Sequence, residues 1–203
     1  MKIMKTNYFI LLLVMSFLLF GCATDSDKVG TVIGAAAIGG DTNPQQPADN
    51  KPTINQLLDN KQSMTGQLED LDSDLTVDVL YSGVENKKFE RIVSLNLADE
   101  PVLIGVSQAR QSSPYFVNIL KNANTTPIGM VLFAPNSQIR RDDMQVETIH
   151  LSSIKDIIVK EYLSELGYNY DTHIYKRVST FRYKKQSMQL IEYILPSINQ
   201  FLD

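Results

Sequence analysis

Apolar and polar residues alternate most regularly between residues 89 and 107, in the segment FERIVSLNLADEPVLIGVS. Its first half has the two-residue period of a half-buried strand, and one face carries Arg91, Val93, Leu95 and Leu97. The residues from 98 to 101, Ala-Asp-Glu-Pro, favour a turn, and residues 102–107 return as a second strand. Because a buried arginine requires an anion, Arg91 either reaches solvent at the strand end or lies inside to meet a carboxylate.

Four other stretches have the same strand-like pattern, namely residues 75–82, 144–151, 172–183 and 188–195. Short helices are expected before and between them, with N-caps at Thr53, Ser113, Thr126 and Ser153, and residues 63–65 interrupt or restart the first helix. The last of these helices carries an apolar stripe from 154 to 166 and is closed by Gly167. No strand alternates with a long crossover helix, so the pattern predicts an α+β fold with a six-stranded antiparallel sheet.

The N-terminus has the organisation of a secretory signal. Two lysines precede an apolar run at 9–20, which is too short to span a bilayer as a helix. The sequence Leu-Phe-Gly-Cys at 19–22 resembles the lipobox of bacterial lipoproteins, which implies cleavage before Cys22 and its lipidation. Ala23 follows where Asp would retain a lipoprotein in the inner membrane, so the resemblance implies the outer membrane of the cell envelope. The alternative is an ordinary secretory peptide in which Cys22 is incidental.

Three segments are therefore expected: a signal peptide at 1–21, a lipidated tether at 22–52 and one folded domain at 53–203. The tether is small, polar and proline-bearing, apart from an apolar run at 29–40. Gly30 and Gly34 in that run have the spacing of a helix-packing motif, which is the alternative to a simple linker.

Composition excludes several classes of function. The chain has 19 basic and 23 acidic residues, and cleavage of the signal removes Lys2 and Lys5 but no acid, which argues against a nucleic-acid partner. Cys22 is the only cysteine and His150 and His173 are the only histidines. A disulfide, a catalytic thiolate in the folded domain and a histidine-rich metal cluster are thus excluded, and we expect no metal site.

Some residues have candidate chemistry. Ser152 and Lys155 form a Ser-x-x-Lys pattern, but the other motifs of penicillin-binding enzymes are missing and the serines suit a helix cap better. Glu192 is the one acid in an apolar run, either an edge charge or a placed hydrogen-bonding group. Gly129, in a short apolar helix, suggests a close approach to the backbone.

The folded part of the chain resembles the chorismate pyruvate-lyase family. The matching strings run in order over residues 54–198: LLDNKQSMTGQLE at 57–69, FERIVSLNLADEPVLIG at 89–105, TPIGMVLF at 126–133, Arg141-Asp142, and RVSTFRYKKQSMQLIEYILP at 177–196. The resemblance implies a six-stranded antiparallel sheet whose helices and loops enclose a ligand cavity. It also implies conversion of chorismate to 4-hydroxybenzoate and pyruvate, without a metal or an organic cofactor.

The family's ligand-contacting positions fall on Met64, Arg91, Ile128 and Glu192, with Ile128 replacing a leucine. The resemblance implies that Arg91 holds the ring carboxylate and that Glu192 accepts a hydrogen bond from the hydroxyl at the other end of the ring. Met64 and Ile128 would press on the flat ring, and the amide near Gly129 could reach the carboxylate. Arg91 and Glu192 would be the catalytic pair, because the elimination chiefly needs orientation and exclusion of water.

Two features leave a second function open. The segment at 152–171 is longer than in cytoplasmic members of the family, and a lipoprotein lies outside the compartment in which chorismate is made. The alternative is a non-catalytic protein of the cell envelope that binds a small aromatic carboxylate. The extra helix at 154–166 could also contact a protein partner.

Overall fold

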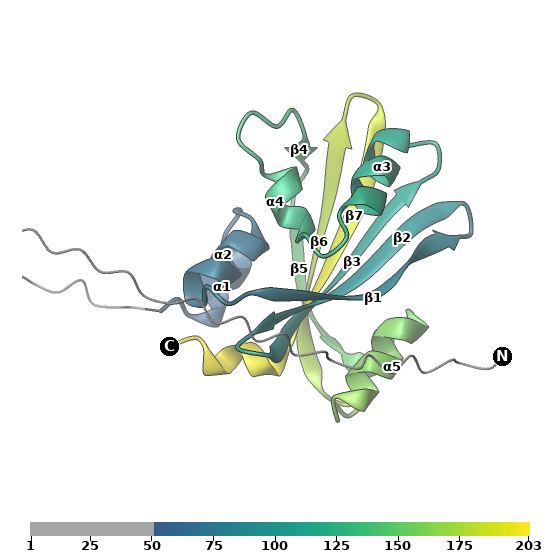
Figure 1. Ribbon diagram of the computed structural model, residues 1–203. Helices are drawn as coiled ribbons and strands as arrows, with labels where there is room; N and C mark the ends of the chain where they lie inside the picture. The colour runs from purple at the N-terminus through teal and green to yellow at the C-terminus, as the bar shows by residue number, and fades with distance from the viewer. Residues whose placement is uncertain (1–50) are drawn as a thin grey trace, which may run out of the picture. The chain divides into compact units, whose positions relative to one another are not determined.

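A computed structural model describes residues 51–203 (Figure 1). The predicted signal peptide, Cys22 and nearly all of the predicted tether lie outside these residues. The strands are β1 (Thr76–Glu85), β2 (Lys88–Leu97), β3 (Glu100–Arg110), β4 (Arg140–Arg141), β5 (Gln145–His150), β6 (His173–Tyr183) and β7 (Gln186–Ile194). The α-helices are α1 (Ile54–Asp59), α2 (Met64–Leu71), α3 (Pro114–Asn122), α4 (Ile128–Leu132) and α5 (Ile157–Glu165). Two 3-10 helices are η1 (Leu151–Ser153) and η2 (Pro196–Gln200).

The strands form one antiparallel sheet in the order β1-β2-β3-β7-β6-β4, and β5 also pairs with β6. The prediction of an α+β fold is confirmed, and all six predicted strands are present. The predicted number of strands was wrong by one, because Arg140 and Arg141 add a two-residue strand beside β6. So short a strand has no readable alternation in sequence.

The β2–β3 hairpin is tighter than predicted. Ala98 and Asp99 both have positive φ, 46° and 64°, which is the backbone of a two-residue hairpin turn. The strand therefore resumes at Glu100, and Pro101 lies inside β3, opposite Asn96 and beside a register shift in β2. A proline is tolerated at such an irregularity because the ladder is already interrupted there.

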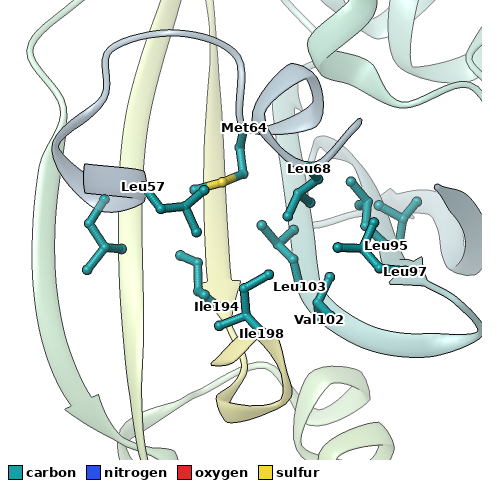
Figure 2. Close-up of a cluster of buried hydrophobic side chains, with 11 residues drawn as sticks. Leu57, Met64, Leu68, Leu95, Leu97, Val102, Leu103, Ile194 and Ile198 are labelled. Carbon is teal, nitrogen blue, oxygen red and sulfur yellow. The ribbon is translucent and has the colours of Figure 1, made fainter. Parts of the chain in front are cut away.

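Helices α1 to α4 cover one face of the sheet (Figure 1). Under α1 and α2, apolar side chains from the helices meet side chains from β2, β3, β7 and η2 (Figure 2): Leu57, Leu58, Met64, Leu68, Val93, Leu95, Leu97, Val102, Leu103, Ile194 and Ile198. A second cluster lies under α3 and α4 and includes Phe116, Leu120, Ile128 and Leu132. The candidate site lies where these two clusters adjoin.

Helix α5 covers the opposite face (Figure 1), where Val159 and Leu163 pack with Ile92, Ile104 and other buried residues. Its N-cap is Asp156, whose carboxylate accepts hydrogen bonds from the amides of Ile158 and Val159. The predictions of a Ser153 cap and of a start at 154 were therefore wrong. Gly167 closes the helix with φ +83°, as predicted.

Among the other predicted caps, Thr53 and the N-cap position of Ser113 are confirmed, whereas Thr126 is wrong. Thr53 forms a capping box with Gln56. Ser113 precedes α3 but caps nothing with its side chain; its hydroxyl accepts a hydrogen bond from the amide of Ser187 instead. Helix α4 starts after Pro127, so Thr126 is not its cap. Within residues 51–203, no helix is both long and apolar enough to cross a membrane.

Candidate functional site

The floor of the candidate site is a row of residues across four strands. Val93 on β2 pairs with Gly105 on β3, which pairs with Glu192 on β7, which pairs with Arg177 on β6. Alternate residues of a strand share a face, so this row and the next one along the strands point toward α2 and α4. Because Gly105 has no side chain, it leaves space above the sheet in the middle of this row. A Cβ there would lie 3.4 Å from a methyl group of Val93.

The roof is the N-terminal end of α2 packed against α4. Ser63, at the N-cap of α2, accepts a hydrogen bond from the amide of Gly66. A Cβ at Gly129 would lie 2.5 Å from the hydroxyl oxygens of Ser63 and Thr65. The predicted close approach at Gly129 is thus confirmed, and the approaching group is the start of α2.

Between floor and roof lies a cavity lined by residues of both clusters: Ser63, Met64, Thr65, Val93, Leu95, Leu103, Gly105, Ser107, Ile128, Gly129, Phe133, Arg141, Arg177, Phe181, Leu190 and Glu192. Its volume is about 20 Å³, which is close to the space needed by one water molecule. A substituted benzene ring needs several times this volume. The floor and the roof must therefore separate before a ring can enter.

Glu192 forms a buried bidentate ion pair with Arg177. The Nε of Arg177 donates to one carboxylate oxygen at 2.7 Å and its Nη2 donates to the other at 3.1 Å. The two side chains are only 7% and 1% exposed. Nη1 of Arg177 also donates to the carbonyl of Asn60, which ties the α1–α2 linker to the sheet. The pair fixes the carboxylate of Glu192 in the cavity wall, where its oxygens accept hydrogen bonds.

Arg141 supplies a second guanidinium to the cavity wall. Its Nη2 donates to the carbonyl of Lys61, and its guanidinium carbon lies 5.1 Å from the centre of the Phe133 ring. Burial lowers the pKa of Arg141, and the charge of Arg177 lowers it further, while Glu192 opposes both effects. The cavity wall thus carries two guanidinium groups and one carboxylate, an excess of positive charge.

Arg91 lies one row away and is 2% exposed. Its Nη2 donates to the carbonyls of Asn124 and Thr126, at 2.6 and 3.1 Å, while its buried Nη1 has no hydrogen-bond partner. Burial lowers the pKa of Arg91, but an arginine remains protonated at neutral pH. Of the two alternatives predicted for Arg91, the structure shows the buried one. Among the described residues, no carboxylate pairs with it.

Four of the five predicted ligand-contacting residues line one cavity: Met64, Ile128, Gly129 and Glu192. Arg91 does not line it, but its cross-strand neighbour Ser107 does. No functional role was predicted for Arg177, Arg141 or Gly105. Both arginines lie in the strings that carry the resemblance, so the signal was present; their pairing with Glu192 and with the α1–α2 linker was not readable.

Ser152 and Lys155 of the Ser-x-x-Lys pattern are exposed and lie beside η1, away from the cavity. The hydroxyl of Ser153 donates to the carbonyl of His150, which is a local structural contact. Over residues 51–203, no three His, Cys, Asp or Glu side chains gather in a way that could hold a metal ion.

No protein-family model matches the sequence, and no curated protein matches it. Among solved structures, YydK of Bacillus subtilis, a possible transcriptional regulator, is 11% identical with a TM-score of 0.47. That alignment covers 67% of this chain and 61% of YydK, so this chain spans less than two thirds of that protein. Gene product SA0254 of Staphylococcus aureus is 12% identical over 72% of this chain and 93% of its own, with a TM-score of 0.49.

The C-terminal domain of the histidine utilization repressor from Pseudomonas syringae is also similar, at 9% identity over 61% of this chain and 92% of that domain. Its TM-score is 0.44. Similarity at this level assigns no function to the chain.

Proposed function

We propose that the domain at 53–203 binds a small aromatic carboxylate between Arg91 and Glu192. The observation that carries this proposal is the state of Arg91, a buried guanidinium with one unpartnered nitrogen and, within residues 51–203, no paired acid. A buried charge of this kind is costly unless an anion completes it. A carboxylate is the group that matches a guanidinium in charge and shape.

The sheet spacing suits a ligand with polar groups at both ends of a ring. Arg91 and Glu192 lie two strands apart and are offset by two residues, so their Cα atoms are separated by roughly 12 Å. Both side chains leave the same face, and Gly105 lies between them without a side chain. In this proposal the carboxylate meets Arg91, and a hydroxyl at the far end donates to Glu192.

In this proposal, α4 and the N-terminal end of α2 move away from the sheet to admit the ligand. The helix α4 has five residues; Met130 on it is 53% exposed, and Phe133 at its C-cap is 37% exposed. Moving these side chains therefore exposes little additional core. Met64 and Ile128, which already line the cavity, would then contact the two faces of the ring.

A second candidate function is the chorismate lyase reaction, which the resemblance of the five sequence strings favours. Loss of the enolpyruvyl group from chorismate produces an aromatic ring, so the protein would need to orient the substrate and exclude water. The enclosed position of Glu192 beside Arg177 suits such a site. The same groups would bind 4-hydroxybenzoate, so turnover rather than binding separates the two functions.

Calorimetric titration with 4-hydroxybenzoate tests the binding proposal. Arg91→Ala should weaken binding by about 2 to 5 kcal/mol, because the ligand carboxylate loses its buried partner. The control is Arg182→Ala, which removes an exposed arginine paired with Asp142. Because Arg91 also holds two loop carbonyls, Arg91→Lys and a thermal melt of each variant distinguish lost binding from lost folding. Unchanged affinity in a folded Arg91 variant would refute the proposal.

Incubation with chorismate tests the lyase candidate. A lyase should release pyruvate and 4-hydroxybenzoate faster than buffer does, and Arg91→Ala and Glu192→Ala proteins prepared identically should lose this excess rate. Equal rates in all three proteins, together with binding of 4-hydroxybenzoate, would leave a binding protein without this activity.

We also propose that Cys22 is lipidated and anchors the domain to the cell envelope, in the outer membrane. The support is the apolar run at 9–20 followed by Leu-Phe-Gly-Cys. Radiolabelled palmitate should be incorporated into the protein in cells, and Cys22→Ala should abolish the label. A mature periplasmic protein with a free thiol would contradict this proposal.

A further inference from the structure

The only two histidines of the chain meet on the sheet. His150 ends β5 and His173 begins β6, and the two residues are direct partners in the antiparallel pair. Their ring centres are 4.0 Å apart, with an angle of 48° between the ring planes. Both side chains are exposed. Neither histidine lines the candidate ligand cavity. The proposed binding function therefore does not explain why the two rings lie against each other.

The neighbouring residues hold this pair in register. Ile149 and Ile174 form the adjacent cross-strand pair and point to the opposite face, where they pack in the apolar cluster under α5. Leu151, directly after His150, is 1% exposed in the same cluster. A slip of one residue would move these apolar side chains into solvent. The two imidazoles are therefore presented together by a strand pair that the core fixes.

We propose that His150 and His173 form a two-imidazole chelating site for a divalent transition-metal ion of the Zn²⁺, Ni²⁺ or Cu²⁺ class. Directly opposed residues of an antiparallel pair have Cβ atoms about 5 Å apart, so modest ring rotations can bring one nitrogen of each ring to the same ion. Neutral imidazole is a common ligand for these metals. Water completes the coordination, because no third protein ligand of the described chain joins the pair.

The surroundings exclude a hard cation such as Ca²⁺ at this position. The acid nearest along β5, Glu147, points to the other face and pairs with Lys176 at 2.7 Å. Ca²⁺ and Mg²⁺ require several oxygen ligands, which the two histidines do not supply. A transition-metal ion would instead link β5 to β6, the only strand in the described part of the chain that pairs with β5.

The test is calorimetric titration of the full-length chain with ZnCl₂, NiCl₂ and CuCl₂, purified without a polyhistidine tag. Cys22→Ser is present in every sample so that the only thiol does not bind metal. We expect one site per chain for at least one of the ions. His150→Asn and His173→Asn should each weaken it about tenfold or more, since loss of one ligand removes the chelate.

Glu147→Gln is the matched control, because it removes a potential ligand from the same strand but the opposite face. It should leave the affinity unchanged. The same concentration of metal should also raise the melting temperature of the parent protein, by mass action on the folded state, and should raise it less in either histidine variant. Absence of binding, or equal affinity in the parent and in both folded histidine variants, would overturn the proposal.

Discussion

At the residue scale, the ion pair of Arg177 and Glu192 is the buried interaction on which the candidate site depends. Both side chains are almost fully removed from water, and each satisfies the other through two hydrogen bonds. Desolvation offsets much of the attraction in such a pair, whereas loss of one partner leaves an uncompensated charge. The stability of the site thus depends on the presence of both partners more than on the energy of the pair.

Glu192→Ala is expected to lower the free energy of unfolding by about 3 to 5 kcal/mol, because Arg177 is left buried and unpaired. The double variant Arg177→Met/Glu192→Leu should recover most of this loss, since neither charge remains. Urea denaturation measures both values. Asp142→Ala, which breaks the exposed pair with Arg182, is the control and should cost about 1 kcal/mol or less. Equal losses in the buried and exposed pairs would contradict the argument.

Glu90 gives a pH-dependent prediction on the opposite face. Burial raises the pKa of Glu90 above its ordinary value of 4.5; Asp156 and Glu85 raise it further, while a hydrogen bond from Gln108 opposes them. A raised folded-state pKa contributes stability that is complete below the unfolded pKa and is lost as pH rises through the folded pKa. Above its folded-state pKa, the ionised form of Glu90 is therefore destabilising.

Glu90→Gln should accordingly raise the melting temperature at pH 7, because glutamine can still accept the hydrogen bond from Gln108 and carries no charge. The difference between variant and parent should shrink as pH falls below the folded pKa of Glu90. Thermal melts between pH 4 and pH 7 measure it. A constant difference over this range would show that ionisation of Glu90 does not contribute.

At the scale of elements, the contact between α2 and α4 forms the roof of the cavity. It depends on Gly129, whose missing side chain lets α4 approach the hydroxyls of Ser63 and Thr65. Gly66, on α2 itself, has no comparable constraint, because a Cβ there would meet only the Cβ of Ser63 at 3.8 Å. The two glycines therefore have opposite expected responses to the same substitution.

Gly129→Ala should destabilise the protein by about 1 to 3 kcal/mol, because the added methyl group forces α4 away from α2. Gly66→Ala should stabilise it by up to about 1 kcal/mol through helix propensity. Chemical denaturation gives the stabilities, and titration with 4-hydroxybenzoate shows whether the displaced roof changes affinity. If both substitutions stabilise the protein, α2 and α4 are not in the close contact described here.

At the scale of the whole domain, the sheet separates the apolar clusters under α1 to α4 from the apolar cluster under α5. The face under α1 to α4 contains the candidate site, whereas the face under α5 contains an apolar cluster with Val159 and Leu163 fully buried. The segment at 152–171, which contains α5, thus covers this second cluster. The predicted helix has a stabilising role there, and a protein partner at its outer face remains a prediction.

Leu163→Ala should lower the free energy of unfolding by about 2 to 5 kcal/mol, because it leaves a cavity in the α5 cluster. The affinity of the remaining folded protein for 4-hydroxybenzoate should be unchanged, since the site lies on the other face. Leu166→Ala, at the partly exposed end of α5, is the control and should change stability by about 0.5 kcal/mol or less. Denaturation and titration of the same samples check both statements.

Local patterns were sufficient for six of the seven strands, for the position of the β2–β3 turn and for the capping box at Thr53, because these depend on neighbours a few residues away in the chain. The same reasoning misplaced the cap of α5, where Asp156 rather than Ser153 binds the free amides. Serine and aspartate are similarly good caps, and only the packing of η1 against the sheet decides which residue begins the helix. The two-residue β4 was missed because so short a strand has no readable alternation and its partner strand, β6, lies about 40 residues further along the chain.

The polar positions of the candidate site were visible in the chain, because Arg91 and Glu192 interrupt apolar alternation and Gly129 interrupts a short helix. The residues with which Arg91 and Glu192 form hydrogen bonds could not be predicted from the sequence. Arg177 reaches Glu192 through strand pairing, and Arg91 reaches the carbonyls of Asn124 and Thr126 through the fold of a distant loop. Side-chain periodicity is a property of one strand, whereas charge pairing, cavity volume and the meeting of His150 with His173 arise only when separate strands are placed in register.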